Sequence, residues 1–473
     1  MRKLLTSFIA ICVGVSSGFA QDSLDFSLKV DVRKVEKNSS VNAYFTPYKP
    51  FATRILSTLN GYKKKDIKTD VYGGRLDRKE KATGFYYTKK IDGRWWAIDP
   101  NGYLFLHNAV NAVSYGSSDR NKNAFATKFG SEEKWINETQ KFLRENGFNG
   151  SGAWSNAKAI TNSALQKEKP LAYTINLDFM SAYGDKRGGT YVVPGHKGYP
   201  NNVIFVFDPQ FEEFCDQYAQ RITANKNDPN LFGYFSDNEM PLGIKNLDGY
   251  LTLKDLEDPG YMAAKKWIDE QRVTIDKITD AHRLAFLEIV ADRYFAIVSK
   301  AIKKYDPNHM YLGCRFHGQQ TKWQALWKSA GKYTDAISMN YYNAWTPNQA
   351  EMANWANWSG KPFLITEWYV KGDDSGLGNT AGAGWVVKTQ NDRGLFYQNF
   401  TLGLIESKNC IGWHWFKYMD NDPEQKGAEP SNTNANKGML DNDYQTYAPL
   451  VEKMKELNFQ MYQLTDFFDK KKR

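Results

Sequence analysis

Cysteine and histidine are scarce in this sequence, with four and six in 473 residues. Cys12 lies in an apolar N-terminal stretch, and Cys215, Cys314 and Cys410 lie in or beside later apolar segments. If the N-terminal stretch is removed, an odd number remains that cannot form a complete set of disulfides, so we expect buried free thiols. No His-x-His, His-Glu-x-x-His or paired-cysteine motif occurs, and the sequence predicts no metal site.

Glycine-rich cofactor loops are also missing. Gly382-Ala383-Gly384 lacks the preceding strand and following helix of a phosphate cradle. Two acidic turns, Asp420-Asn421-Asp422 and Asp441-Asn442-Asp443, lack the twelve-residue pattern and terminal glutamate of a calcium loop. We therefore expect no cofactor.

Long apolar runs are confined to the N-terminus. Residues 1–20 begin with Arg2 and Lys3, continue through an apolar stretch and end in small residues up to Ala20, which is typical of a secretory signal peptide. Cys12 follows a residue that is not small, which favours cleavage after Ala20 over lipidation. No other segment reaches about 20 apolar residues, so the sequence predicts a secreted or periplasmic protein without a membrane span.

Positive charge is in excess but scattered. The formal net charge is +9, with basic runs at 63–65 and 470–473. No zinc knuckle or basic helix accompanies these runs, so they do not indicate nucleic-acid binding. A basic protein can favour a sulfated or otherwise anionic glycan, although no particular residue supports this in the sequence. Nothing in the sequence indicates an oligomeric state.

The chain divides into four expected parts. The signal peptide is followed by a polar, strand-bearing N-terminal extension at 21–83, and a catalytic domain at 84–465 precedes a basic tail at 466–473. The catalytic domain opens with hairpins, since Asp92-Gly93 and Asn101-Gly102 separate apolar stretches.

Strand-like and helix-like segments then alternate, which indicates a parallel α/β sheet. Eight strands are expected, at 104–113, 150–154, 172–177, 232–236, 310–316, 336–340, 363–366 and 410–415. The clearest helices are expected at 132–146, 209–225, 279–304, 391–408 and 446–458. Eight βα units make a (β/α)8 TIM barrel the simplest topology, with long loops at 178–204, 240–278, 370–388 and 417–440 on its active face.

Two glutamates follow apolar strands in this scheme. Glu239 ends Leu-Phe-Gly-Tyr-Phe-Ser-Asp-Asn-Glu after the fourth strand, and Glu367 ends Lys-Pro-Phe-Leu-Ile-Thr-Glu at the seventh. Both are therefore expected at the carboxyl-terminal mouth of the barrel. Close carboxylates among apolar walls differ in pKa, so that one acts as proton donor while the other stays ionised. This is the pair that cleavage of a glycosidic bond requires.

Asn238-Glu239 and Thr366-Glu367 resemble the motifs of the large clan of retaining (β/α)8 glycoside hydrolases. The resemblance implies that Glu239 is the acid/base and Glu367 the nucleophile, and that Asn238 hydrogen-bonds the sugar 2-hydroxyl. Within that clan, residues 91–102 and 233–239 are similar to the entry motif and acid/base strand of the agarase-type enzymes of family 50. The similarity covers most of residues 84–460 and implies hydrolysis of β-linked galactose in a red algal galactan such as agarose or porphyran.

Further candidates contact the substrate in the same scheme. In the wider clan a tyrosine after the sixth strand holds the nucleophile, and Tyr341 is expected to do so ahead of its neighbour Tyr342. Period two places Trp413 and Trp415 on one face of the eighth strand, with Trp415 as the sugar platform and Trp413 as filling for the barrel. His317 and His414 are candidate pocket residues, as is His107, although a lone histidine is more often structural.

The sequence thus predicts a retaining glycoside hydrolase whose partner is an oligo- or polysaccharide. Two alternatives remain open. One is a β-galactosidase or a mannan- or glucan-cleaving enzyme of the same clan, and the other is a noncatalytic glycan-binding protein on a barrel scaffold. The choice between exo and endo action depends on whether the long loops close one end of the cleft.

Overall fold

The computed structural model describes residues 28–37, 43–425, 427 and 429–470. The expected signal peptide, with Cys12, lies outside these residues. Cys215, Cys314 and Cys410 are buried free thiols, as expected. No helix within the described ranges is long and apolar enough to cross a membrane.

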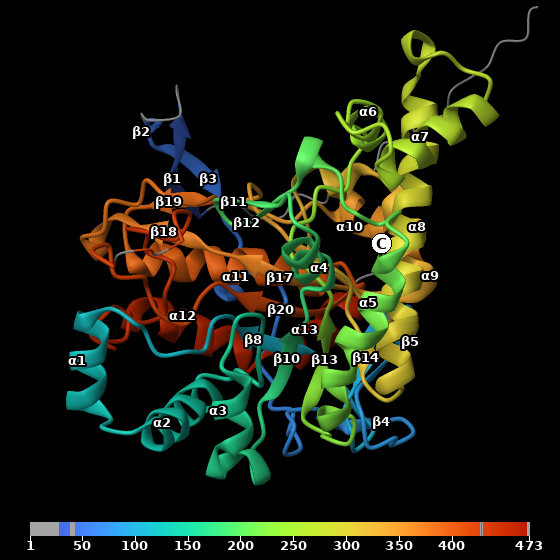
Figure 1. Cartoon of the computed structure of the whole chain (residues 1–473). Coiled ribbons are helices and arrows are strands. Elements are labelled where there is room, and N and C mark those ends of the chain that lie inside the picture. The colour runs from blue at the N-terminus through green and yellow to red at the C-terminus, as the bar shows by residue number, and fades with distance from the viewer. Residues whose placement is uncertain (1–27, 38–42, 426, 428, 471–473) are drawn as a thin grey trace, which may run out of the picture.

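A curled sheet of nine parallel strands forms the centre of the molecule (Figure 1). In spatial order its strands are β14 (Met310–Tyr311), β13 (Leu231–Phe235), β10 (Ala172–Asn176), β9 (Gly150–Ser151), β8 (His107–Val110), β20 (Cys410–Trp415), β17 (Phe363–Trp368), β16 (Ile337–Asn340) and β15 (Phe316–His317). Every expected strand contributes to this sheet. Both faces of these strands are buried, which explains their nearly continuous apolar sequences.

The two outermost strands, β14 and β15, are consecutive in the chain and belong to one expected strand. Between them, the Leu312 N–H donates to the carbonyl oxygen of Tyr234 on β13 at 2.8 Å. The carbonyl oxygen of Leu312 in turn accepts the N–H of Ser338 on β16 at 3.0 Å. The sheet therefore curls back on itself, and the fold is mixed α/β and TIM-barrel-like.

Helices connect the strands and cover the outside of the sheet (Figure 1). The five expected helices are present as α2 (Glu132–Glu145), α5 (Gln210–Ala219), α8 (Asp280–Tyr305), α11 (Gln390–Glu406) and α12 (Ala448–Asn458), with a 3-10 turn at Gln220–Asn225 in place of the end of α5. The others are α1 (Asp119–Lys128), α3 (Ala157–Asn162), α4 (Phe179–Arg187), α6 (Asn246–Leu251), α7 (Pro259–Glu270), α9 (Gln324–Tyr333), α10 (Gln349–Ser359) and α13 (Met461–Lys470).

A four-stranded antiparallel sheet packs at the amino-terminal end of the barrel-like sheet. Its order is β4 (Arg75–Lys79), β7 (Tyr103–Phe105), β6 (Arg94–Ile98) and β5 (Tyr87–Ile91). The expected first barrel strand is thus divided between β7 and β8. The buried guanidinium groups of Arg75 and Arg94 bind Asp466 and Asp469 of α13, at 2.7 and 2.8 Å. Helix α13 therefore runs across the expected boundary at residue 465.

A third sheet lies beside the carboxyl-terminal end of the barrel-like sheet (Figure 1). Strand β1 (Lys29–Lys37) pairs with β2 (Ala43–Phe45), β3 (Lys49–Ala52) and β19 (Trp385–Val387), and β19 also pairs with β18 (Val370–Gly372). Strands β18 and β19 lie in the long loop after Glu367. The N-terminal strands are thereby tied to a loop of the active face.

Candidate active site

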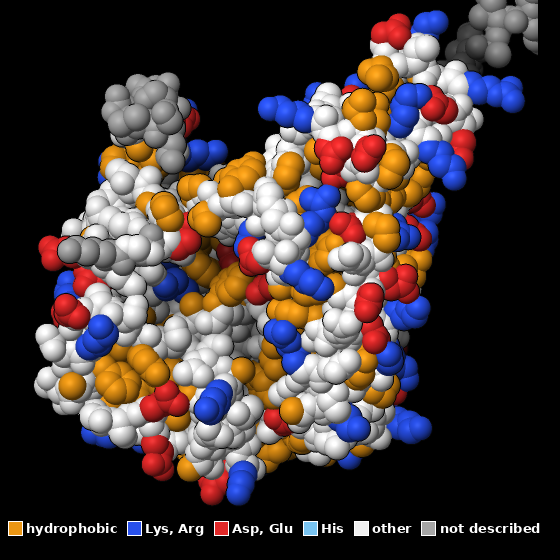
Figure 2. Space-filling view, in the orientation of Figure 1, with side chains coloured by type: hydrophobic (Ala, Val, Ile, Leu, Met, Phe, Trp, Pro, Cys, Tyr) orange, Lys and Arg blue, Asp and Glu red, His pale blue; other side chains and the backbone are white. Residues whose placement is uncertain are grey.

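A cleft of about 1070 Å³ opens at the carboxyl ends of the parallel strands. Figure 2 shows one face of the molecule, which is hollowed near its centre. Both Glu239 and Glu367 line this cleft, together with residues of the hairpin β11 (Tyr191–Val193) and β12 (His196–Gly198) and of the loop after β20. Three of the four loops expected on the active face, at 178–204, 370–388 and 417–440, therefore line the cleft, whereas the loop at 240–278 contributes none of its lining residues.

Glu239 follows β13 and is held by the neighbouring strands. Its Oε1 accepts a hydrogen bond from Nδ2 of Asn340 at 2.8 Å, and Nδ1 of His196 lies 3.8 Å from Oε2. The side chain is only 13% exposed. Burial, followed by the negative charge of Glu367, raises the pKa of Glu239 to about 7. Glu239 can therefore carry a proton near neutral pH.

Glu367 lies on β17 among donors. Its Oε1 forms an ion pair with Nη2 of Arg315 and accepts a hydrogen bond from Nε1 of Trp154 at 3.3 Å. Its Oε2 accepts a hydrogen bond from the hydroxyl of Tyr342. A guanidinium group and two neutral donors converge on one carboxylate and fix its orientation. The two glutamates thus occupy opposite environments in one cleft.

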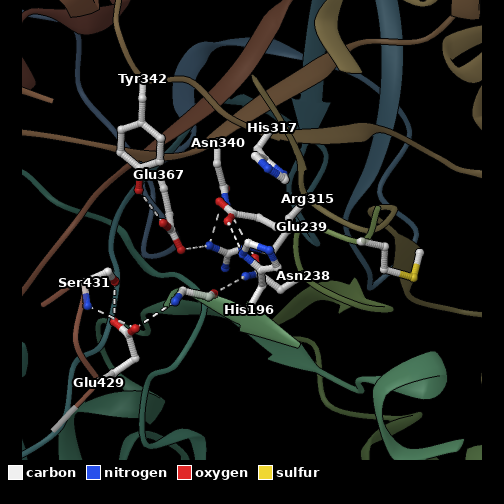
Figure 3. A network of polar contacts seen from close by, with 12 residues as sticks. His196, Asn238, Glu239, Arg315, His317, Asn340, Tyr342, Glu367, Glu429 and Ser431 are labelled. Carbon is white, nitrogen blue, oxygen red and sulfur yellow. Dashed lines mark hydrogen bonds and ion pairs between the residues drawn. The ribbon is translucent and has the colours of Figure 1, made fainter. Parts of the chain in front are cut away.

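Asn340 contacts both Glu239 and Arg315, the ion-pair partner of Glu367 (Figure 3). Besides binding Glu239, its Nδ2 lies 3.4 Å from Oδ1 of Asn238, while its Oδ1 accepts hydrogen bonds from Thr366 Oγ1 at 2.9 Å and from Arg315 at 3.4 Å. Asn238 also donates to the carbonyl oxygen of Gly195 at 3.4 Å. Both contacts of Asn238 are long, so its amide is available to a sugar.

Three of these residues have a left-handed backbone. The φ angles of Glu239, Arg315 and Trp154 are 48°, 52° and 64°. Residues other than glycine seldom adopt this region, and such strain concentrates at functional sites. Glu239 and Trp154 follow β13 and β9, and Arg315 lies between β14 and β15. At each position the left-handed backbone turns the side chain into the cleft.

The expectation that Tyr341 contacts Glu367 is wrong. Its hydroxyl donates to Glu351 at 3.1 Å, and its ring packs against Trp355 of α10 and Phe400 of α11. Successive residues of an extended chain point to opposite sides. Since Asn340 points into the mouth of the sheet, Tyr341 points out toward the helices and Tyr342 points in again.

The expectation that Trp415 is the sugar platform is also wrong. Trp413 was expected to contact the substrate or to fill the inside of the barrel, and it does neither. Both are fully buried between β20 and the helices. Trp415 packs against Trp368 and Tyr397, and Nε1 of Trp413 lies 3.3 Å from the hydroxyl of Tyr397. The two do share one face of the strand, but it is the outer face.

The inner face of β20 presents His414. Its Nε2 lies 2.9 Å from Nδ1 of His107, whose own Nε2 lies 2.9 Å from the carbonyl oxygen of Ala172. Both rings are fully buried below the cleft, and burial lowers the pKa of His107 to about 4. This pair therefore fills the inside of the sheet. His317 does line the cleft, with its ring 5.8 Å from that of His196.

Several cleft residues were not predicted. Trp154 was expected to end a strand, and its left-handed backbone, which the sequence does not reveal, turns its indole to Glu367. Arg315 lies in the irregular segment between β14 and β15, and His196 begins β12 within an expected loop; neither belongs to a sequence motif. Polar residues of the segment after β20, including Lys417, Glu429 and Lys437, also line the cleft. Within the described part of the chain, no group of three or more His, Cys, Asp or Glu side chains is placed to hold a metal.

Two carboxylates in a cleft at the carboxyl ends of a TIM-barrel-like sheet are typical of glycoside hydrolases. No protein-family model matches the sequence. The crystal structure of BpGH50 is 31% identical, with a TM-score of 0.82 over 94% of this chain and 96% of that one. The chain belongs to glycoside hydrolase family 50.

Two further comparisons agree with this assignment. The agarase AgWH50C is 21% identical with a TM-score of 0.68, over 85% of this chain and 67% of that one. β-Agarase B of Vibrio sp. (strain JT0107) is 24% identical over 83% of this chain. The chain spans about half the length of that curated relative.

Proposed function

We propose that the protein hydrolyses β-galactosidic bonds in a red algal galactan, agarose, porphyran or their oligosaccharides, with retention of configuration. The observation that carries the proposal is the contrast between Glu239, whose pKa is raised to about 7, and Glu367, which is surrounded by Arg315, Tyr342 and Trp154. The family and the agarase activity named for its relatives support the choice of substrate.

In the first step, protonated Glu239 transfers its proton to the glycosidic oxygen while the bond between that oxygen and the anomeric carbon breaks. The ionised carboxylate of Glu367 attacks the anomeric carbon and forms a glycosyl ester. The ester carries no charge, so the repulsion that raises the pKa of Glu239 disappears. Glu239 then takes a proton from water, whose oxygen attacks the anomeric carbon and releases Glu367.

The remaining residues orient the sugar in this scheme. Asn238 contacts the 2-hydroxyl, a hydrogen bond that strengthens in the transition state. Trp154, 43% exposed in the cleft, offers its indole face to the sugar ring. The scaffold is a (β/α)8 barrel at 84–465 with an N-terminal extension at 21–83 packed on it. Retention requires the carboxyl groups to lie about 5 to 5.5 Å apart in the sugar complex, whereas about 6.5 to 9.5 Å would mean inversion.

Product analysis tests the proposal. The protein is incubated with agarose, porphyran and their oligosaccharides, and NMR spectroscopy records the anomer that is released first. We expect galactan oligosaccharides in the β-configuration from the wild type and none from Glu367→Gln. Initial release of the α-anomer would overturn the retaining mechanism, and no release from any of these substrates would overturn the assigned substrate.

A further inference from the structure

Two lysines line the cleft beside Glu367. Lys417 directly follows Phe416 at the end of β20, and Lys437 lies in the loop beyond. The amino group of Lys437 lies 4.7 Å from the centre of the Tyr369 ring, which packs 5.3 Å from the ring of Tyr342. Tyr342 hydrogen-bonds Glu367. A short chain of contacts thus connects this part of the cleft with the nucleophile.

The amino groups of Lys417, Lys437 and the buried Lys371 bind only neutral oxygens among the described residues. Lys437 donates to the carbonyl oxygen of Ser431 and to Oδ1 of Asn432, both at 2.7 Å. Lys417 donates to Oδ1 of Asn421. Lys371 donates to two carbonyl oxygens at 3.0 Å. Lys371 and Lys437 are 0% and 3% exposed, and a buried charge without an opposite partner is costly.

Three acids lie near these lysines, and each is bound by other donors. Glu367 is held by Arg315, Trp154 and Tyr342. Glu429, which also lines the cleft, accepts the N–H groups of Gly195 at 2.7 Å and Ser431 at 3.1 Å and the amide of Asn432 at 3.0 Å. Asp420 accepts the backbone N–H groups of residues 437 and 438, a side-chain amide and a tyrosine hydroxyl. Their charges act on the lysines from a distance only. Among the described residues, the two lysine amino groups that line the cleft therefore have no carboxylate in direct contact.

We propose that Lys417 and Lys437 form a subsite for an anionic substituent on the galactan, a sulfate half-ester or a uronate carboxylate, near the bond that is cleaved. The inference rests on the proposed function and names its substrate class more closely. A negatively charged oxygen that enters the cleft would form charge-assisted hydrogen bonds with the two amino groups. Phe416, which lines the cleft beside them, offers apolar contact to the sugar that carries the anion.

The pKa values of these lysines add a second measurable property. Burial lowers the pKa of Lys417 to about 8 and that of Lys437 to about 7. A bound anion favours the charged form and raises both values. Binding at pH 7.5 should therefore take up protons from the buffer.

Calorimetry tests the subsite without relying on turnover. Glu239→Gln protein, which keeps both lysines and Glu367, is titrated with three probes: agarose oligosaccharides, porphyran oligosaccharides that carry sulfate, and agarose oligosaccharides oxidised at C6 to uronates. We expect at least one anionic probe to bind about tenfold more tightly than the neutral one. The sulfated and oxidised probes distinguish the two anions. Titrations in HEPES and in Tris at pH 7.5 report the uptake of protons.

Substitutions assign the effect to the lysines. Adding Lys437→Met or Lys417→Met should weaken the preference and the proton uptake, and adding both should abolish them. The affinity for the neutral probe should be kept, which also shows that the cleft is folded. Lys322→Met, at an exposed lysine elsewhere on the rim of the cleft, should change neither the preference nor the proton uptake.

Equal affinity for neutral and anionic probes would overturn the subsite, as would a preference that survives both lysine substitutions. If the wild type cleaves none of the probes but the preference depends on Lys437, the subsite stands and the proposed hydrolysis fails.

Discussion

Tyr342 donates its hydroxyl group to Oε2 of Glu367, at the point where β16 and β17 meet the cleft. Its ring is held between the strand end and the ring of Tyr369, 5.3 Å away. Burial and the charge of Glu367 raise the pKa of Tyr342 well above its ordinary value. The tyrosine therefore remains a proton donor across the working pH range and fixes the orientation of the carboxylate.

Replacing Tyr342 with phenylalanine should lower kcat/KM about 10- to 100-fold. The change removes one hydrogen bond to a charged group, worth about 1.5 to 3 kcal/mol, and each 1.4 kcal/mol corresponds to a factor of ten. Steady-state kinetics on agarose oligosaccharides measure this effect. Tyr341→Phe is the matched control, because the Tyr341 hydroxyl contacts Glu351 and not Glu367. Equal losses in both variants would contradict the assignment of Tyr342.

The raised pKa of Glu239 predicts a decline of activity on the alkaline side. Its proton is needed in the first step, so kcat/KM should be highest below the pKa of about 7 and fall as pH rises through it. Initial rates between pH 4 and 9 measure this limb. A profile that stays level from pH 6 to 9 would exclude Glu239 as the acid.

The same group makes stability depend on pH. The pKa of Glu239 is higher in the folded protein, about 7, than its ordinary value of 4.5. Its contribution to the free energy of folding is therefore fully present below pH 4.5 and is lost as pH rises through 7. Urea unfolding should show the wild type losing stability relative to Glu239→Gln over this window. A difference that is constant from pH 4.5 to 8 would contradict the raised pKa.

The sequence predicted the barrel strands and five long helices because their apolar patterns are local. Helices within the expected loops, such as α4 and the longer α7, were not predicted, and α4 depends on a distant contact. The first turn of α4 is capped by Asp237, whose carboxylate accepts the N–H groups of Met180 and Ser181 at 3.0 Å. This capping residue comes more than fifty positions later in the chain. The sequence pattern of residues 178–187 alone therefore predicted only a loop.

The sequence placed residues in the cleft correctly where a carboxylate follows an apolar strand. It failed where the direction of a side chain determines whether the residue faces the cleft. Glu239 and Glu367 follow apolar strands, and both line the cleft as expected. Trp413 and Trp415 were placed on one face correctly, but both faces of a barrel strand are apolar, so the pattern does not distinguish inside from outside. Beyond the end of a strand, as at Tyr341, the direction of a side chain is set by the folded backbone and does not follow from the sequence pattern.

Trp154 should contribute both to the orientation of Glu367 and to sugar binding. Trp154→Phe keeps a ring but removes the hydrogen bond from Nε1 at 3.3 Å, so we expect kcat to fall several-fold, up to about tenfold, with little change in KM. Trp154→Ala also removes the ring and should raise KM. Trp415→Phe is the control, because Trp415 is fully buried outside the cleft. It should lower Tm and leave KM unchanged; an increase in KM for Trp415→Phe would return that residue to the substrate site.

Gly150 on β9 should tolerate no larger residue, because the histidine pair fills the space inside the sheet. A Cβ atom added there would lie 2.0 Å from Nε2 of His107 and 2.8 Å from the carbonyl oxygen of Ala172, two atoms that face each other at 2.9 Å. Overpacking of this kind costs about 1 to 3 kcal/mol. Gly243→Ala, where nothing lies within 4 Å, should change the free energy of unfolding by less than about 0.5 kcal/mol. Urea unfolding of both variants measures the difference, and a Gly150→Ala protein as stable as Gly243→Ala would mean that the histidine pair can move aside.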